Sequence, residues 1–364
     1  MTERVVVAGG GMSGLAAAEG LESEGFEVLL IDQSRHHVYR PGIPSMINGR
    51  SAESLRFDID QHLRKTDIEY TCEEIKKFKP DKKQVEAEYG DYDYDYLVVA
   101  LGGEVRSPKF SLNYAEDFYS LESSEEGVEK VEGAENAIVV GAGYTGLEVA
   151  LRLDAEGVET SVVDSSTRPL SDASSKVSGK VLDLLNSREI GFMGDRRVME
   201  IPNYGVEFEE GDERKADLVV WCGGLEAPEV VQEGFNTGKS GINVNRGLSA
   251  ADFENVYAVG RCADIEGGNR ALESVRQGKQ VARNIGRDEG LLEEYEPSTG
   301  KRIVSSPGSG FMVRGESFSS GRHANVLDFV VEKRYFAGLR GRRILKGLMP
   351  SIDPLLSLMD DKEK

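Results

Sequence analysis

Three glycines near the start of the chain have a spacing that can bind a pyrophosphate. Gly9, Gly11 and Gly14 follow an apolar run at residues 5–7 and form the pattern G-x-G-x-x-G. In such a pattern the first glycine permits the turn, and the second lets backbone N–H groups approach the phosphates. The third lets a helix pack closely against the preceding strand. The chemistry predicted here is the binding of a nucleotide through its phosphates.

The segments that follow complete the unit to which these glycines belong. We expect a helix from about residue 13 to 24, with Met12 and Ser13 at its positive, phosphate-facing N-terminus. A second strand over residues 26–31 ends in Asp32, 18 residues after the last glycine. A carboxylate at this position can accept hydrogen bonds from a ribose. Strand, glycine turn, helix, strand and acid together predict a dinucleotide-binding βαβ unit.

The same unit recurs in the middle of the chain. A strand at residues 136–140 is followed by a glycine turn, a helical pattern over 147–156 and a strand over 159–163 that ends in Asp164. The residues of this turn and helix start are Gly141, Gly143, Tyr144, Thr145 and Gly146. Two such units suggest two dinucleotides, a permanently held FAD and an exchangeable NAD(H). Asp164 favours NAD because it would repel a 2′-phosphate, and Arg168 weakens that preference.

Three further strands that end in glycine outline the domains. They cover residues 92–103, 216–224 and 255–264 and bring Gly102, Gly223 and Gly260 to strand ends; a helical stretch over about 270–284 follows. The order predicts an α/β fold with two Rossmann-like dinucleotide-binding domains, the second inserted into the first. The expected parts are the FAD domain (1–105 and 236–292), the NAD(H) domain (106–235) and a C-terminal membrane-attachment or dimerisation region (293–364). Residues 305–310 are expected to form a loop.

Composition restricts the partners and the compartment. The chain has 364 residues, with 64 Asp and Glu against 44 Lys and Arg and a formal net charge of −20. Such a charge repels nucleic acid, so no nucleic-acid partner is expected, and it is also typical of proteins that stay soluble in high salt. Cys72, Cys222 and Cys262 are far apart, which fits a reducing compartment without disulfides. No metal site, transmembrane helix or secretory signal is predicted, so we expect a cytoplasmic protein.

Several motifs together resemble one family of flavoproteins. They are the two G-x-G-x-x-G units, Tyr-Asp-Tyr-Leu-Val-Val-Ala-Leu-Gly at 94–102, Gly-Tyr-Thr-Gly-Leu-Glu-Val-Ala at 143–150 and Val-Gly-Arg-Cys-Ala at 259–263. Over residues 1–290 the chain resembles the two-dinucleotide flavoproteins of the glutathione reductase fold, most of all type II NADH dehydrogenases and sulfide:quinone oxidoreductases. The resemblance implies hydride transfer from NADH to FAD and delivery of two electrons to a quinone. Alternatives are a soluble reductase of a protein carrier, a sulfide:quinone oxidoreductase and a redox sensor.

The resemblance also implies roles for individual residues. Tyr39, Arg40 and Pro41 match a turn that quinone-reducing members place beside the flavin ring; the alternative is a rigid Pro-Gly loop without flavin contact. Glu148 matches a glutamate near the nicotinamide and the flavin, where it would orient the nicotinamide and influence proton delivery; the alternative is an acid that interacts only with the helix dipole. The cysteine pair of the disulfide reductases is absent between residues 38 and 49. Cys222 and Cys262 would either carry sulfur as a pair or be buried structural thiols.

Two positions depart from the family pattern. The Asp that usually follows the glycine of the last strand and binds the flavin ribityl chain is Arg261 here, so either Asp264 replaces it or the contact with FAD differs. The helix whose N-terminus faces the flavin pyrimidine usually begins Ala-Gln, whereas this chain has Ala271 and Leu272.

The C-terminal region reverses the charge of the molecule. Between residues 332 and 349, six basic residues and one acid alternate with apolar side chains, and a second apolar group lies at 352–359. A basic amphipathic segment in an acidic protein predicts attachment to an anionic membrane, which would place the protein at the inner face of the cell membrane beside its quinone. The alternative is a helix that forms a homodimer or docks on the core.

Overall fold

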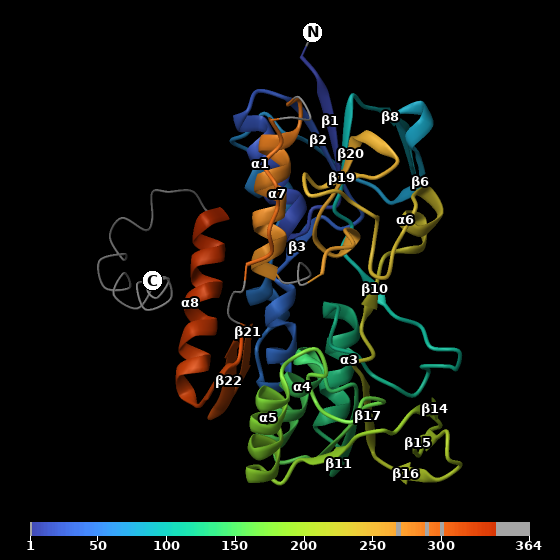
Figure 1. Ribbon diagram of the computed structural model, residues 1–364, viewed down its shortest axis with the longest axis vertical. Coiled ribbons are helices and arrows are strands. Elements are labelled where there is room, and N and C mark those ends of the chain that lie inside the picture. Colours follow the sequence, from blue (N-terminus) through green and yellow to red (C-terminus); the bar gives the residue numbers. More distant parts are fainter. Residues whose placement is uncertain (1, 267–270, 288–290, 299–301, 340–364) are drawn as a thin grey trace.

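The computed structural model describes residues 2–266, 271–287, 291–298 and 302–339 (Figure 1). Two parallel α/β units lie one above the other in this view, and a C-terminal unit lies along one side of both. Most of the basic segment for which membrane attachment is predicted, residues 340–359, falls outside the described residues.

The first unit is built on a six-stranded sheet in the order β19-β20-β9-β1-β2-β5. Its strands are β1 (Arg4–Ala8), β2 (Glu27–Asp32), β5 (Glu69–Cys72), β9 (Tyr96–Val99), β19 (Ser249–Ala250) and β20 (Phe253–Ala258). β1 pairs in parallel with β2 and β9, and β20 pairs in parallel with β9. Because β20 comes after the whole second unit, the chain returns to finish the first sheet, which confirms the predicted insertion.

Two helices cover one face of this sheet in close contact. They are α1 (Met12–Ser23) and α7 (Ala271–Asn284), and the start of α1 lies within one residue of the prediction. Small residues permit the close approach, since a Cβ on Gly20 would lie 2.6 Å from the Cβ of Ala282. A Cβ on Gly278 would overlap the carbonyl oxygen of Ser13. Glycine in the interior of a helix costs conformational entropy. In this domain it allows α7 to pack closely against α1 and the glycine turn before it.

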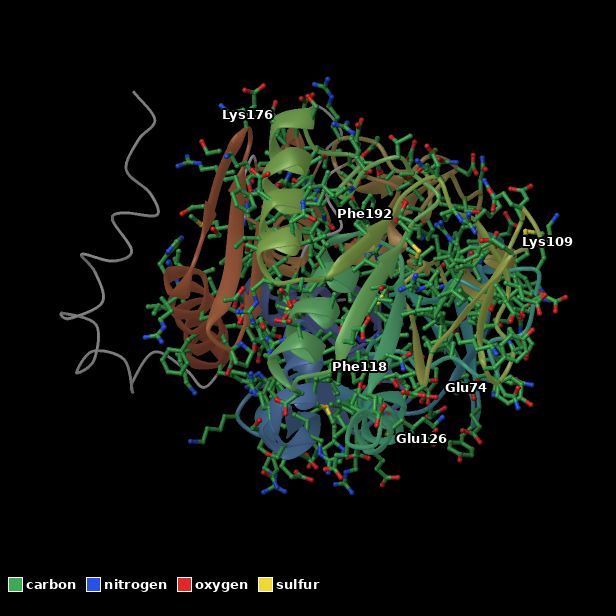
Figure 2. The ribbon with its side chains drawn as sticks, turned by 90° about the horizontal axis from the view of Figure 1, so that it is seen from below. Glu74, Lys109, Phe118, Glu126, Lys176 and Phe192 are labelled. Carbon is green, nitrogen blue, oxygen red and sulfur yellow. The ribbon has the colours of Figure 1, made fainter. Side chains whose placement is uncertain are left out.

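The second unit repeats this plan with the strand order β13-β12-β11-β17, all parallel. Its elements are α3 (Leu121–Val131), β11 (Asn136–Val140), α4 (Tyr144–Ala155), β12 (Glu159–Val163), α5 (Ser175–Ser187), β13 (Gly191–Met193) and β17 (Leu218–Trp221). A short pair, β10 (Glu104–Val105) with β18 (Leu225–Glu226), joins the units. Figure 2 shows this unit from below: Lys176 lies on the surface at the outer end of α5, whereas Phe118 is fully buried.

Smaller elements surround the two sheets. They are β3 (His36–Val38), the 3₁₀ helices η1 (Arg40–Asn48), η2 (Ala52–Leu55), η3 (Pro80–Lys82) and η4 (Gly260–Cys262), β4 (Arg56–Asp58), α2 (Ile59–Leu63), β6 (Ile75–Lys79), β7 (Gln84–Ala87), β8 (Asp91–Asp93), β14 (Val198–Glu200), β15 (Gly205–Phe208), β16 (Glu213–Lys215) and α6 (Glu229–Gly234). The 3₁₀ helix η1, which follows the strands β2 and β3 in the chain, packs against α3 and α4 of the second unit.

The C-terminal unit is a three-stranded antiparallel sheet and one helix. It consists of β21 (Arg302–Ser306), β22 (Ser309–Arg314), β23 (Ser317–Ser320) and α8 (Arg322–Leu339). The predicted loop at residues 305–310 is wrong, because Ser306 pairs with Ser309 and Pro307 and Gly308 form the tight turn of a hairpin. Serine has a low intrinsic preference for strands, so the sequence did not predict this pairing. The two serines on either side of the turn are buried, and packing against the neighbouring helices stabilises the hairpin.

Polar contacts fasten this unit to the rest of the molecule. The hydroxyl of Ser306 donates to the carbonyl of Leu151 in α4 (2.8 Å), and the side-chain amide of Asn325 bonds to both backbone groups of Ser306 (2.6 and 3.2 Å). Arg50 makes a bidentate ion pair with Glu332 (2.6 and 2.8 Å). The α8 helix is therefore docked on the second dinucleotide unit at one end and on the first at the other.

The described start of the basic segment partly faces inward. Tyr335 is only 9% exposed, and Phe336 packs against Tyr39 and Phe57. Of these two aromatic side chains, both expected in the membrane-attachment segment, Tyr335 belongs to the protein core and the partly buried Phe336 packs against it. The outer face of α8 carries Val326 and Phe329, which are 49% and 58% exposed. Within the described residues, no helix combines the length and apolar character that crossing a membrane requires.

We predict that Asn325→Ala destabilises the docking of the C-terminal unit. The substitution removes the side-chain partner that Asn325 supplies to each backbone group of the buried Ser306, which costs about 1–3 kcal/mol. Urea unfolding should show this loss, and limited proteolysis should cut residues 302–339 earlier than in the parent protein. Val326→Ala, the neighbouring exposed position, serves as the control. Equal proteolysis of both variants would contradict the fastening role of Asn325.

Candidate functional site

The first glycine turn joins β1 to α1 and leaves the helix N-terminus open. Gly9 has φ +106°, and a Cβ there would lie 2.5 Å from the carbonyl oxygen of Ala100. A Cβ on Gly14 would overlap the carbonyl oxygen of Gly9. Around Gly11, however, the nearest protein atom to such a Cβ is 4.0 Å away, and α1 has no side-chain cap. The packing of the protein would therefore accept a side chain at position 11. A phosphate bound to the uncapped N–H groups would occupy that space, which gives a reason for glycine there.

The second glycine turn has the same construction. Gly141 has φ +114° and lies against the carbonyl of Cys222, and a Cβ on Gly146 would overlap the carbonyl of Gly141. At Gly143 no atom lies within 4 Å of a Cβ, and α4 also begins without a side-chain cap. The helix begins at Tyr144, three residues before the range that the sequence indicates. Both turns thus offer free backbone donors and open space to a pyrophosphate.

The acids at the ends of β2 and β12 brace the glycine turns. Asp32 accepts hydrogen bonds from the N–H groups of Gly10 (2.5 Å) and Ser34 (2.7 Å). Asp164 accepts from Ala142 (2.6 Å) and Ser166 (2.7 Å) in the same pattern. Burial raises the pKa of Asp32, and the two backbone donors oppose that rise. Each acid therefore has a structural role beside the ribose contact predicted from the sequence.

The side chain of Arg168 is bonded to the loop that follows β12. Its guanidinium donates to the carbonyls of Ser171 (3.1 Å) and Ala173 (3.0 Å) and so holds the loop after β12. The sequence suggests that Arg168 weakens the preference of Asp164 for NAD. In the structure, one nitrogen of this guanidinium, Nη2, is engaged with the loop.

The glycine-ended strands meet at the junction of the two units. Gly102 follows β9, Gly260 follows β20, and a Cβ on Gly260 would lie 2.9 Å from the hydroxyl of Ser13 at the start of α1. The N–H of Gly260 donates to Gln277 of α7 (2.6 Å). Gly223 follows β17 in the second unit, where a Cβ would overlap the indole of Trp221. The first sheet thus brings Gly102 and Gly260 to the edge at which the first glycine turn lies.

The two departures from the family pattern have clear structural outcomes. The carboxylate of Asp264 accepts from the N–H of Lys239 (2.9 Å) and the hydroxyl of Ser240 (2.5 Å), so its contacts brace a neighbouring loop and give no support to a ribityl contact. The stem of Arg261 packs against Gly103, and burial lowers the pKa of its guanidinium. Leu272 is 46% exposed, directly after Ala271 at the first position of α7.

The 3₁₀ helix η1 forms one wall of the junction. Pro41 lies in its first turn, where a missing N–H costs no hydrogen bond. The guanidinium of Arg40 donates to the carbonyl of Tyr119 (3.3 Å), in the segment that leads into α3. The predicted turn therefore lies between the two dinucleotide units, although its side chains make few contacts in the structure.

Glu148 lies on α4 and forms part of a buried polar network. Its carboxylate accepts from Nε (3.1 Å) and Nη2 (2.9 Å) of Arg152, one helical turn further on. Arg152 also donates to the side chain of Asn48 at the end of η1 (3.0 Å). Burial raises the pKa of Glu148 to about 7, and the charge of Arg152 opposes this. A carboxyl group with such a pKa can hold and release a proton near neutral pH.

The structure adds residues that sequence reasoning missed. His37 is buried; its Nδ1–H donates to the carbonyl of Gly10 (2.8 Å), and its Nε2 accepts from the hydroxyl of Tyr335 (2.7 Å). Burial lowers the pKa of His37 to about 4, so the ring is neutral and can serve one donor and one acceptor. The C-terminal helix therefore contacts the first glycine turn through one histidine. The spacing of these residues in the sequence carries no signal of that contact.

Both candidate redox cysteines are buried in protein packing. The thiol of Cys262 lies near the carbonyl of Gly102 (3.4 Å), and Cys222 lies against Gly141 and Gly146. Burial raises the pKa of both thiols, that of Cys262 to about 12. A thiol is nucleophilic as the thiolate, so these environments favour a structural role. Among the described residues, no group of His, Cys, Asp and Glu side chains could hold a metal ion.

Comparisons with known proteins agree with this geometry. The assimilatory nitrate reductase electron transfer subunit of Bacillus subtilis is 27% identical over 305 residues, 78% of this chain; the match spans only 39% of that protein. A type II NADH:quinone oxidoreductase of Staphylococcus aureus is 24% identical over 333 residues, covering 78% of this chain and 82% of that protein. The solved sulfide:quinone oxidoreductase of Aquifex aeolicus superposes with a TM-score of 0.82 at 21% identity, over 98% of this chain and 95% of that chain.

A match to a defined protein family covers more than half of the chain. It runs over residues 3–282 and so includes both glycine turns, the strands that end in glycine and nearly all of α7. The chain therefore belongs to the pyridine nucleotide-disulphide oxidoreductase family.

Proposed function

We propose that this protein transfers hydride from NADH to FAD and two electrons from FAD to a quinone. Membership of its family makes the chain an FAD-dependent oxidoreductase of pyridine nucleotides. The observation that carries the finer proposal is the pair of open, uncapped helix N-termini at Gly11 and Gly143, in two units joined by short strands. One chain can thus hold a donor and an acceptor of hydride together.

Each dinucleotide has a set of residues suited to it. FAD would lie on the turn from Gly9 to Gly14, beside Gly102, Gly260 and the start of α7 at Ala271. NADH would lie on the turn from Gly141 to Gly146, with Asp164 near the adenine ribose and Gly223 near the junction. Bound FAD supplies the capacity to accept a hydride and to release two electrons. The backbone donors of the two turns would hold the pyrophosphates of the two dinucleotides.

Glu148 is proposed to deliver a proton to the reduced acceptor. Because burial raises its pKa to about 7, the carboxyl is largely protonated below pH 7 and largely ionised above it. Two hydrogen bonds from Arg152 to one oxygen of the carboxyl, Oε1, hold Glu148 in position on α4. Hydride transfer needs no side-chain base, so the proposed role of Glu148 belongs to the second half of the reaction.

The C-terminal unit supports a quinone as the acceptor. The likeness to the sulfide:quinone oxidoreductase covers 98% of the chain and must therefore extend well beyond residue 293. The type II relative from Staphylococcus aureus also acts, by its name, on a quinone. We further propose that the outer face of α8, with Val326, Phe329 and Lys333, rests on an anionic membrane surface where a quinone is available.

A second candidate function is the transfer of electrons to a protein carrier. It is favoured by the similarity to the nitrate reductase electron transfer subunit, which is the relative with the higher sequence identity. In that case the exposed face of α8 would contact a protein. Sulfide oxidation is less well supported, because Cys222 and Cys262 are both buried with raised pKa values.

Anaerobic stopped-flow kinetics of the purified yellow protein test the proposal. NADH should bleach the flavin, sulfide should not, and a water-soluble quinone should restore the colour. Gly143→Val should keep FAD but lose NADH affinity about a hundredfold, since two lost hydrogen bonds to phosphate cost about 3 kcal/mol. Gly11→Val is the matched control and should lose FAD instead. A parent flavin that NADH reduces but no quinone reoxidises would favour the protein carrier.

We predict that NADH reduces the flavin much faster than NADPH. Asp164→Asn combined with Ser165→Arg should narrow the difference, because the change removes a negative charge and supplies a partner for the 2′-phosphate. Asparagine keeps an acceptor for one of the two N–H groups that Asp164 binds, so the turn should persist. The ratio of the two bleaching rates measures the effect. Equal rates in the parent protein would refute the assignment of NAD.

The cysteines supply a test of the alternative chemistry. Cys222→Ser and Cys262→Ser should each retain FAD and most of the rate of flavin reduction by NADH, since both thiols are buried and protonated. The measurement is single-turnover bleaching at equal flavin concentration. Loss of turnover in either variant, with FAD still bound, would restore thiol chemistry as the leading hypothesis.

A further inference from the structure

Side chains hold both backbone groups of Gly10, the residue at the centre of the first glycine turn. Its N–H donates to the carboxylate of Asp32 (2.5 Å), and its carbonyl oxygen accepts from Nδ1 of His37 (2.8 Å). The peptide that follows is trans, so the N–H of Gly11 points away from the carbonyl of Gly10. His37 therefore also sets the direction of a backbone N–H at the open start of α1.

The two hydrogen bonds of His37 have only one possible direction. A carbonyl oxygen can only accept, so Nδ1 carries the proton in the bond to Gly10. Burial lowers the pKa of His37 to about 4, so at neutral pH the ring has a single proton and Nε2 accepts. The hydroxyl of Tyr335 is therefore the donor in the second bond (2.7 Å). Tyr335 on α8 thus favours the tautomer in which His37 serves the glycine turn.

The imidazole has little freedom to turn and no access to a replacement partner. His37 is 1% exposed, and its ring stacks on Phe57 of the paired strand β4 with 4.7 Å between ring centroids. The ring of Tyr335 packs on the buried ring of Tyr39 (5.3 Å). In such a place water does not replace a lost partner, so each of the two hydrogen bonds depends on the protein alone.

The turn of α8 that carries Tyr335 is fastened to the first unit at two further points. Glu332, three residues earlier, makes the bidentate ion pair with Arg50 (2.6 and 2.8 Å). Phe336, the next residue, packs against the same two aromatic rings that border His37 and Tyr335. Docking of this turn of α8 therefore brings the hydroxyl of Tyr335 to His37.

We propose that docking of the C-terminal helix and binding of FAD are coupled through His37, with His37 and Tyr335 as positioning residues of the first glycine turn. The inference rests on the proposed function only for the placement of FAD on that turn. Docked α8 holds Gly10 in the conformation that directs the N–H of Gly11. In return, bound FAD favours the docked helix, because a coupling between two equilibria acts equally in both directions.

The coupling gives the molecule a property that neither glycine turn has by itself. Chains that hold FAD keep α8 docked and present its outer face in a fixed position. Chains without FAD release the helix more often and then lose that face. The surface proposed to meet the membrane is thus assembled on chains that hold the cofactor.

The first test removes a single hydroxyl group. Full-length protein freed of FAD is titrated with FAD, and flavin fluorescence gives the dissociation constant. Tyr335→Phe should weaken FAD binding about tenfold, the effect expected for one buried hydrogen bond. Tyr94→Phe is the matched control, because the buried hydroxyl of Tyr94 has no hydrogen-bond partner among the described residues. It should bind FAD as the parent does.

Two variants of His37 separate the donor to Gly10 from general packing. Asparagine and leucine have the same shape, but only asparagine places an N–H where Nδ1 lies. His37→Asn should therefore bind FAD more tightly than His37→Leu. Asparagine does not reach Tyr335, so adding Tyr335→Phe to His37→Asn should cause no further loss. A further tenfold loss in this double variant would show that Tyr335 acts by another route and would overturn the inference, even if His37→Leu fails to fold.

The reciprocal test measures docking of the C-terminal helix. Under limited proteolysis, FAD should slow cleavage within residues 302–339 about tenfold in the parent protein and much less in Tyr335→Phe, because the coupling is the same in both directions. Equal protection of the two proteins by FAD, or equal FAD affinity, overturns the coupling and leaves the proposed function intact. A protein that shows both effects but passes no electrons to a quinone keeps the coupling and loses the proposed function.

Discussion

The N-termini of α1 and α4 both end in backbone N–H groups that no side chain caps, and the surrounding structure keeps them open. Each is reached by a turn in which one glycine has a positive φ and another lies against the carbonyl of the first. Asp32 and Asp164 then hold the turns from the ends of the next strands with matching pairs of hydrogen bonds. The ordinary cost of unsatisfied donors is offset when an anionic ligand binds them.

The rest of the chain places these two open ends in one molecule at a fixed separation. The return of β20 to the first sheet completes that domain after the second has been built, so the connecting strands β10 and β18 pair side by side. The 3₁₀ helix η1 comes from the chain of the first unit and packs on α3 and α4 of the second. This arrangement limits relative motion of the two glycine turns, as a reaction between two bound rings requires.

The C-terminal unit makes specific polar contacts with both dinucleotide units. Its β21 strand carries adjacent serines that contact α4 and α8, and Tyr335 reaches the first glycine turn through His37. The buried ions at this contact need partners from three separate segments of the chain. Such polar contacts specify one docked position of α8, since any displacement would leave charged groups buried without partners.

The sequence by itself determined both dinucleotide units, because glycine spacing, apolar strands and terminal acids are local patterns within 30 residues. It also indicated the order of the domains and the family. Only the tertiary structure decided the environment of Glu148, the structural tasks of Asp264 and Arg168, and the inward position of Tyr335. Those properties depend on burial and on partners more than 100 residues away, such as Asn48 for Arg152. The hairpin at Ser306 also depends on tertiary burial, because the polar residues around its Pro-Gly turn form paired strands only when they pack against the rest of the protein.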